Sequence, residues 1–117
     1  IGEPLRGGGA LRATAADVLS YLEAATGTGP ATLSAAWQQA LQPQRPSPNG
    51  HAGLLLFVET WNGRTLYSKD GQTAGFSSQV LFTTEPPAMV VLLANTNEIA
   101  GTGGLRRLGL SILAGLP

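Results

Sequence analysis

The N-terminal part of the chain carries apolar residues at the three- and four-residue spacing of amphipathic helices. These residues are Val18, Leu22 and Ala25 in one segment and Leu33, Trp37 and Leu41 in the next. Thr14 and Asp17 form a Thr-x-x-Asp variant of the capping box, so we predict a helix of about three turns that follows Thr14 and ends at Gly27. A second short helix is predicted after Pro30 and before Pro43.

The apolar pattern then changes from helical to strand-like. Residues 54–61 are rich in β-forming residues, Asn62-Gly63 is the favoured type I′ hairpin turn, and residues 65–69 supply the returning strand. Two more strands are predicted at 77–84 and 88–94, and the prolines between them cannot continue a ladder. We therefore predict four antiparallel strands.

The last predicted strand contains the run Met-Val-Val-Leu-Leu at 89–93, which does not alternate between apolar and polar residues. Both of its faces should be covered, so we place it at the centre of the sheet. A C-terminal helix is predicted to cover the sheet through one apolar face. That face comprises Leu105, Leu108, Ile112 and Leu116.

These patterns predict an α+β fold with three parts. Residues 1–41 form the end of a helical region, and residues 51–117 form an antiparallel sheet with a packed C-terminal helix. Between them, residues 42–50 contain three prolines and no periodic apolar pattern, which is typical of a linker.

Composition and charge exclude several kinds of partner. The 117 residues have a formal net charge of zero and only 12% charged residues, so we expect no nucleic-acid partner and no polybasic membrane anchor. The longest apolar run, at 52–58, is too short to span a bilayer. The chain has no cysteine, and its one histidine, His51, cannot assemble a zinc site alone, so we predict no metal and no cofactor.

One segment of the predicted sheet carries a motif with known chemistry. The sequence Lys-Asp-Gly-Gln-Thr-Ala-Gly-Phe occupies residues 69–76, at the end of a strand. It resembles the third active-site motif of the serine β-lactamase and penicillin-binding-protein superfamily, and most closely that of the class C β-lactamase and esterase branch. Asp70 stands where threonine is usual. The matching positions are Lys69, Gly71, Thr73, Gly75 and Phe76.

The resemblance covers most of the chain, from about Gly7 to the end. Residues 9–17 resemble the glycine-containing turn that leads into a helix of the family's helical domain, and residues 92–97 resemble its Leu-Ala-Asn strand end. The resemblance implies the sheet portion of the family's α/β sandwich, a bacterial hydrolase, and a periplasmic or extracellular location. It also places Asn95 and Asn97 beside the substrate; alternatively, they cap the following helix or turn.

The resemblance assigns a role to each residue of the motif. Acyl transfer to a serine develops an oxyanion, and the backbone N–H of Gln72 would be one donor of the oxyanion hole. Lys69 would supply a cation that holds the proton network of the nucleophile and attracts an anionic substrate group. Gly71 would let the substrate lie against the strand, and Thr73 would belong to the same binding wall. Asp70 would also face substrate, but an ionised carboxylate cannot donate a hydrogen bond to a substrate carboxylate, which favours an ester or peptide without that group.

Each of these assignments has a structural alternative. Lys69 would then be a solvated lysine at a strand end, and Thr73 an ordinary half-buried hydroxyl. Gly71 and Gly75 would simply allow a turn.

The nucleophile of that family is not in this sequence. Lys69 is the one lysine, so no Ser-x-x-Lys occurs, and neither Tyr21 nor Tyr67 begins a Tyr-x-Asn. We therefore interpret the chain as a C-terminal fragment that acts on a small-molecule or peptide substrate. In that family the N-terminal strands pair beside the strand that corresponds to 88–94, so in this chain we expect 88–94 to become an edge strand. The expected partner is then the missing N-terminal half of the enzyme, or a second copy through self-association at 89–93. The alternative is a non-catalytic binding or structural module on the same scaffold.

Overall fold

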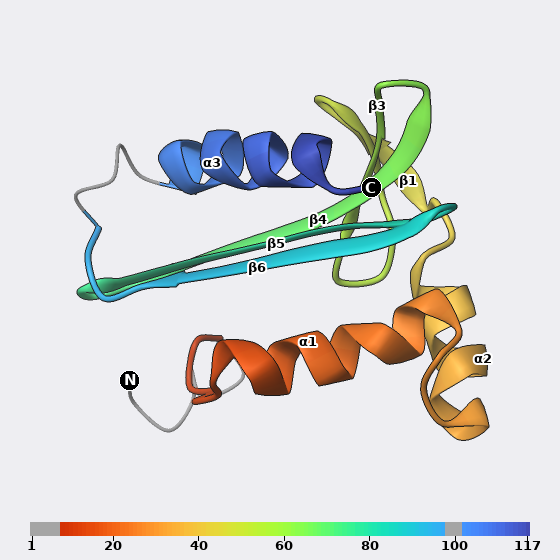
Figure 1. The fold of residues 1–117 in the computed structure, drawn as a ribbon, viewed down its shortest axis with the longest axis horizontal. Helices are drawn as coiled ribbons and strands as arrows, with labels where there is room; N and C mark the ends of the chain where they lie inside the picture. Colours follow the sequence, from red (N-terminus) through yellow and green to blue (C-terminus); the bar gives the residue numbers. More distant parts are fainter. Residues whose placement is uncertain (1–7, 98–101) are drawn as a thin grey trace.

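The computed structural model describes residues 8–97 and 102–117 and arranges them in three layers. An antiparallel sheet lies between helix α3 on one face and helices α1 and α2 on the other (Figure 1). The helical elements are α1 (Ala15–Glu23), the 3₁₀ turn η2 (Ala24–Thr26), α2 (Ala31–Ala40) and α3 (Thr102–Gly115). The strands are β1 (Arg45–Ser47), β2 (Gly50–Ala52), β3 (Phe57–Trp61), β4 (Arg64–Thr73), β5 (Phe76–Thr84) and β6 (Pro87–Ala94). The predicted α+β fold is confirmed.

The first predicted helix begins where its capping box places it. The Asp17 backbone N–H donates to Thr14 Oγ1 and the Thr14 N–H donates to Asp17 Oδ2, both at 3.1 Å. Amide groups that the helix itself cannot satisfy thereby gain acceptors. Beyond η2, Gly27 has a φ of +88°, a left-handed conformation that glycine adopts without steric cost, and the helical segment ends there as predicted.

The sheet is a meander in which each strand pairs with the next, in the order β1 to β6. Asn62 and Gly63 have φ values of +50° and +72°, and positive φ at both positions is the requirement of the predicted type I′ turn. The four predicted strands correspond to β3–β6, although β3 starts at Phe57 rather than at residue 54 and β4 continues to Thr73 rather than ending at Lys69. The structure adds β1 and β2, so the segment 42–50 contains strand structure. Pro46 is tolerated in β1 because that strand lies at the sheet edge.

Strand β6 lies at the other edge of the described sheet. The central position predicted from its apolar pattern is therefore wrong for this chain, whereas the edge position expected in the absence of further N-terminal strands is observed. The strand is apolar on both faces because α1 packs against one face and α3 against the other. Met89 and Val91 join the cluster beneath α1 and α2, whereas Val90 belongs to the cluster beneath α3. Coverage by helices on both faces removes the need for polar alternation even at a sheet edge.

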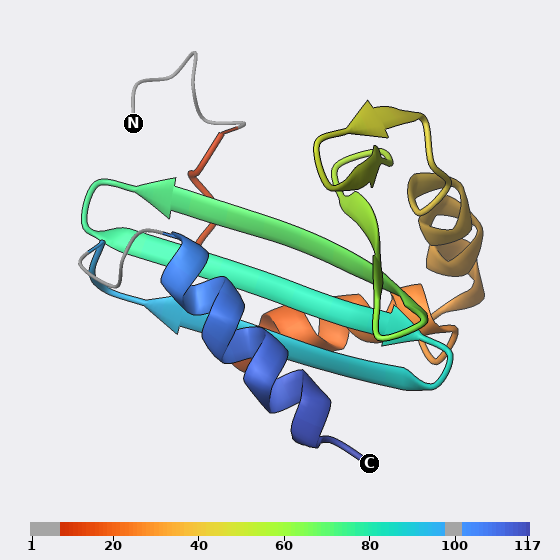
Figure 2. The ribbon, with the colours of Figure 1, turned by 90° about the horizontal axis from the view of Figure 1, so that it is seen from above.

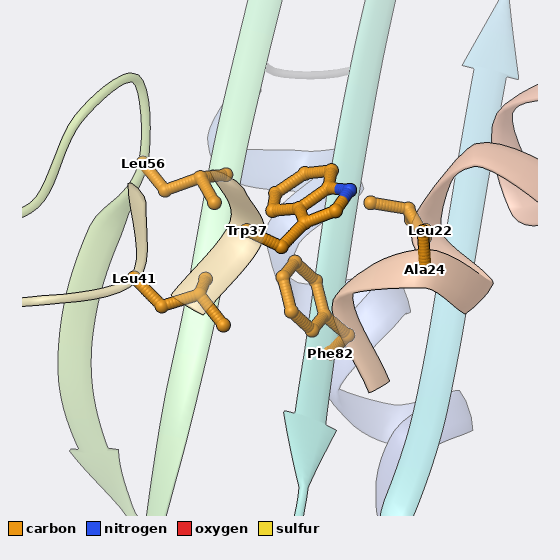
Figure 3. Packing of buried hydrophobic residues seen from close by; sticks show 6 residues of the cluster. All are labelled: Leu22, Ala24, Trp37, Leu41, Leu56 and Phe82. Carbon is orange, nitrogen blue, oxygen red and sulfur yellow. The ribbon is translucent and has the colours of Figure 1, made fainter. Parts of the chain in front are cut away.

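Two hydrophobic clusters hold the layers together, one on each face of the sheet. Phe82, at the centre of the first, is fully buried, and its ring stacks on that of Tyr67 with the centroids 5.2 Å apart. Figure 3 shows the buried members of this cluster, which are Leu22, Ala24, Trp37, Leu41, Leu56 and Phe82. The second cluster joins α3 to the sheet through Leu66, Leu81, Val90 and Leu113.

Helix α3 crosses the sheet obliquely above β5 and β6 (Figure 2). Its buried face is rotated from the predicted one. Leu105 is buried as predicted, but Leu108 and Ile112 are 50% and 39% exposed, and Leu116 is exposed as well. Leu113, which lay outside the predicted face, is buried instead.

Gly109 explains this rotation. A Cβ built on Gly109 would stand 2.5 Å from a methyl carbon of Leu81, so the α3 backbone approaches β5 closely at this point. Gly109 lies midway between Leu105 and Leu113 and completes a face that repeats every four residues. The predicted buried face was wrong because it was derived from apolar side chains alone and left out Gly109.

Candidate functional site

The motif residues 69–73 occupy the part of β4 that extends beyond β3. Pairing of β3 with β4 stops at Phe57 and Ser68, whereas pairing of β5 with β4 continues to Phe76 and Thr73. Residues 69–73 therefore pair with β5 on one edge. On the other edge, no strand of the described residues pairs with them. Backbone groups of successive residues alternate between the two edges of a strand, so this open edge presents unpaired N–H and C=O groups.

Side chains of the motif point alternately to the two faces of the sheet. Leu66 belongs to the cluster beneath α3, and Tyr67 belongs to the cluster beneath α1 and α2. Continuing this alternation places Lys69, Gly71 and Thr73 on the face of α1 and α2, and Asp70 and Gln72 on the face of α3. The predicted site residues of β4 are therefore divided between two faces.

Lys69 is accessible and loosely held. Its side chain is 51% exposed, and its Nζ donates a hydrogen bond to the backbone carbonyl of Asp70. The Asp70 carboxylate lies 3.8 Å from the same nitrogen, and its side chain is 44% exposed. Exposed ion pairs contribute about 1 kcal/mol or less, because water screens the charges. Lys69 can therefore turn toward a ligand at little cost.

Glycine serves a different structural purpose at each of the positions 71 and 75. Gly75 has a φ of +85° in the two-residue turn between β4 and β5, so its turn role is supported. Gly71 lies within the strand and pairs with Ser78, and a Cβ built on it would stand 2.7 Å from Ser78 Oγ. A side chain at position 71 would therefore press against that hydroxyl, and glycine leaves room for it.

The segment that follows β6 returns to the end of β4. Asn97 Nδ2 donates to the Thr73 carbonyl oxygen, and Ser77 Oγ donates to the Thr96 carbonyl oxygen, each at 2.8 Å. Asn97 Oδ1 is buried and has no hydrogen-bond partner among the described residues. The structure therefore brings Asn97 and Thr73 of the predicted site together, whereas Asn95 is exposed.

A hollow of about 280 Å³ opens on the face of α3, beside the motif. Arg106 Nη2 donates to both carboxylate oxygens of Glu59, at 3.0 and 2.9 Å, and Ser68 Oγ donates to Glu59 Oε2 at 3.3 Å. Asp70 and Gln79 also line the hollow. Sequence analysis missed this cluster because Glu59 and Arg106 are 47 residues apart, and a lone glutamate in a β-forming run was the sole signal.

Shifted pKa values occur at two structural positions. Burial raises the pKa of the Tyr67 hydroxyl, and a hydrogen bond with Thr84 opposes that shift. Hydrogen bonds with the backbone and the side chain of Thr14 hold the pKa of the Asp17 carboxyl below its ordinary value of 3.8. Tyr67 stacks in the core and Asp17 caps α1, so neither shift marks a reactive group.

Within the described ranges, no three histidine, cysteine, aspartate or glutamate side chains gather in a way that could hold a metal ion. No helix in the same part of the chain is both long enough and apolar enough to cross a bilayer.

Comparisons with protein-family models, with curated proteins and with solved structures found no match to this chain.

Proposed function

We propose that this chain is the C-terminal part of a β-lactamase-like serine hydrolase, which breaks an ester or amide bond through an acyl-enzyme. The observation that carries the proposal is the position of the motif residues 69–73 at the open edge of β4. No described strand competes for the backbone donors of that edge. A serine hydrolase needs such donors, held in place before reaction, for the oxyanion of its tetrahedral intermediate.

In the proposed reaction, a serine outside this chain attacks the substrate carbonyl, and a neighbouring lysine takes the serine proton. The leaving alcohol or amine accepts a proton and departs as the acyl-enzyme forms. Water then attacks the acyl-enzyme and releases the acid. The Gln72 N–H would stabilise the oxyanion, and Lys69 would hold the proton network from the face that it shares with Gly71.

Asp70 narrows the class of substrate. Its carboxylate stands where the enzymes that the motif resembles carry a hydroxyl that donates to the substrate carboxylate. An ionised carboxylate accepts hydrogen bonds and repels an anionic group, and the 3.8 Å contact with Lys69 offsets this repulsion only in part. We therefore favour an uncharged ester or a peptide bond over a penicillin as substrate.

The second candidate function is a non-catalytic binding or structural module on the same scaffold. Two contacts favour it: Lys69 Nζ rests on the Asp70 carbonyl, and Asn97 uses its amide to hold the Thr73 carbonyl. In such a module these contacts would serve to fasten strand ends. The two candidates differ in whether a serine of the longer polypeptide becomes acylated.

The test compares the longest polypeptide that contains this chain with the isolated 117-residue chain. Both are assayed with a chromogenic cephalosporin and a short-chain nitrophenyl ester, then treated with a fluorophosphonate probe and mapped by mass spectrometry. We expect saturable ester turnover and a labelled Ser-x-x-Lys serine in the long polypeptide, and background rates in the chain alone. An unlabelled long polypeptide would favour the module. Turnover by the isolated chain that a serine-directed inhibitor abolishes would refute the fragment interpretation.

A further inference from the structure

Two hydrogen-bond acceptors without donors lie side by side in the hollow on the face of α3. Asp70 on β4 and Gln79 on β5 are direct partners in the sheet, and both residues line the hollow. Side chains in such a pair start about 4.5–5.5 Å apart, so a glutamine amide ordinarily reaches the carboxylate and donates to it. In this pair the amide nitrogen is used elsewhere.

The amide of Gln79 is buried, and two hydrogen bonds fix its orientation. Its Nε2 donates to the carbonyl oxygens of Lys69 and Val80, at 3.3 and 3.2 Å, so Oε1 points away from those carbonyls. Gln79 is only 3% exposed, and its Oε1 accepts no hydrogen bond from the residues that the structure describes. Removing an amide oxygen from bulk water without giving it a donor is unfavourable. This oxygen therefore favours a ligand that donates hydrogen bonds.

The Asp70 carboxylate gives the hollow a negative charge that neighbouring cations offset only in part. Among the charged residues that line the hollow, Glu59 and Arg106 form an ion pair with each other, which leaves the charge of Asp70. Lys69 Nζ lies 3.8 Å from that carboxylate, too far for a hydrogen bond, and donates instead to the Asp70 carbonyl oxygen. A cation with several N–H donors would therefore satisfy both acceptors.

Phe57 gives the same hollow an apolar wall. Phe57 is 40% exposed, and Pro48 lines the hollow as well. An exposed aromatic ring can pack against an alkyl chain, and its face also attracts a cation. The volume of about 280 Å³ lies just below the range of about 300–1,000 Å³ that is usual for small-molecule sites, so the ligand has to be small.

We propose that this hollow binds the primary ammonium group of a small alkylamine. The ammonium group donates to Gln79 Oε1 and to the Asp70 carboxylate, and the alkyl chain lies against Phe57. A primary ammonium carries three donors and one positive charge, so a single group meets both acceptors and the negative charge beside them. The inference is independent of the hydrolase function, because every group that it uses belongs to the described residues.

Two alternatives predict different ligands. Water also donates hydrogen bonds to Asp70 and Gln79, and if water suffices there, the hollow binds no amine. An anion would be favoured by Arg106 and by the first turn of α3, where Gly103 lines the hollow. Pairing with Glu59 opposes an anion, since the guanidinium charge of Arg106 is already met by a carboxylate at 3.0 and 2.9 Å.

The experiment titrates three ligands into the 117-residue chain at constant ionic strength and follows the Gln79 side-chain amide and the Asp70 backbone amide by NMR. The ligands are n-butylammonium, butyltrimethylammonium, which has the same charge but no N–H donor, and butyrate. We expect saturable shifts with n-butylammonium at roughly millimolar concentration, as for a ligand with few atoms. Butyltrimethylammonium should bind several-fold more weakly, and butyrate should give no saturable shift.

Three results of this titration would overturn the proposal. The first is the absence of saturable shifts with n-butylammonium, as expected if water suffices. The second is tighter binding of butyrate than of n-butylammonium, as expected of an anion site. The third is equal binding of the two cations, because Gln79 would then have no role in recognition.

Two substitutions beside the hollow should act in opposite directions. Asp70→Asn keeps the shape but removes the charge, and it should raise the apparent Kd for n-butylammonium by about three- to tenfold. Lys69→Met removes a competing cation and should lower that Kd by about twofold. The matched control Glu85→Gln removes an exposed carboxylate at the turn between β5 and β6 and should leave it unchanged.

The dispersion of the NMR spectrum shows whether each variant is folded. A folded Asp70→Asn chain that binds n-butylammonium as tightly as the wild type would overturn the site. If Asp70→Asn does not fold, an affinity that Lys69→Met leaves unchanged or weakens would overturn it instead.

Discussion

Arg106 on α3 and Glu59 on β3 form an ion pair in which one guanidinium nitrogen contacts both carboxylate oxygens, at 3.0 and 2.9 Å. The Glu59 side chain is only 9% exposed, so its charge is largely removed from water, and Ser68 Oγ donates a further hydrogen bond. The pair fastens α3 to the sheet next to the strand that carries the motif. Stability of that part of the fold should therefore depend on Arg106.

Replacing Arg106 with methionine keeps an apolar stem but leaves the Glu59 carboxylate without its counter-charge. We expect the free energy of unfolding to fall by about 2–4 kcal/mol, because an unpaired buried charge is costly. Urea denaturation followed by circular dichroism measures the loss. Arg107→Met, at the exposed neighbouring position, is the matched control and should change stability by less than about 0.5 kcal/mol. Equal losses in the two variants would contradict the role of the ion pair.

The two phenylalanines of β5 provide a second matched pair. Phe82 is fully buried between α2 and the sheet, whereas Phe76 is 60% exposed at the start of the same strand. Phe82→Ala should cost about 3–5 kcal/mol, since it removes buried apolar surface and leaves a cavity. Phe76→Ala should cost far less. Denaturant midpoints for both variants test this, and a similar cost at the two positions would mean that the cluster beneath α1 and α2 is misplaced.

Acid should weaken the N-terminal cap of α1. The pKa of Asp17 is held below 3.8 in the folded chain, so the stability that it contributes is present above its ordinary pKa and is lost as the pH falls through the lowered folded value. The difference in unfolding midpoint between the wild type and Asp17→Asn should therefore be constant near neutral pH and shrink below about pH 4. A difference that stays constant down to pH 2 would contradict the capping contact with Thr14.

Local chemistry explains why parts of this fold could be predicted from sequence. The Thr14 and Asp17 capping box and the Asn62-Gly63 turn each depend on residues within a few positions of one another, and both occur where predicted. The buried face of α3 depends instead on how closely Gly109 approaches Leu81, a contact between distant segments. Periodicity within one helix carries no information about such an approach.

The candidate site also has a part that local sequence predicts and a part that it does not. The motif predicted Lys69 at the end of a strand, whereas in the structure β4 continues to Thr73 and β3 stops short of Lys69, which leaves an open edge. The return of Asn97 to Thr73 and the pairing of Glu59 with Arg106 join residues that are 24 and 47 positions apart. Contacts of that range follow from strand register and helix placement, which a single sequence does not determine.

The exposed edge of β6 predicts that the isolated chain associates. Arg106 contacts Glu59 of β3, so it lies on the side of α3 that faces β3. Leu108 and Ile112 lie on the opposite side of the helix, toward β6, and both side chains are half-exposed. Unpaired backbone next to exposed apolar side chains favours pairing with another strand. Light scattering at micromolar concentration should show assemblies, which Leu108→Lys with Ile112→Lys should weaken. A monodisperse, cooperatively folding monomer would contradict this expectation.

The hydrolase proposal is tested most directly at Lys69, in the longer polypeptide that contains this chain. The measurement is kcat/KM for a short-chain nitrophenyl ester, with Arg64→Ala as the control because Arg64 is an exposed cation at the other end of β4. Lys69→Ala should lower kcat/KM by about a hundredfold or more, the effect of losing a principal electrostatic or proton-network group, while Arg64→Ala leaves it nearly unchanged. An unchanged rate in Lys69→Ala would show that the motif has no part in catalysis.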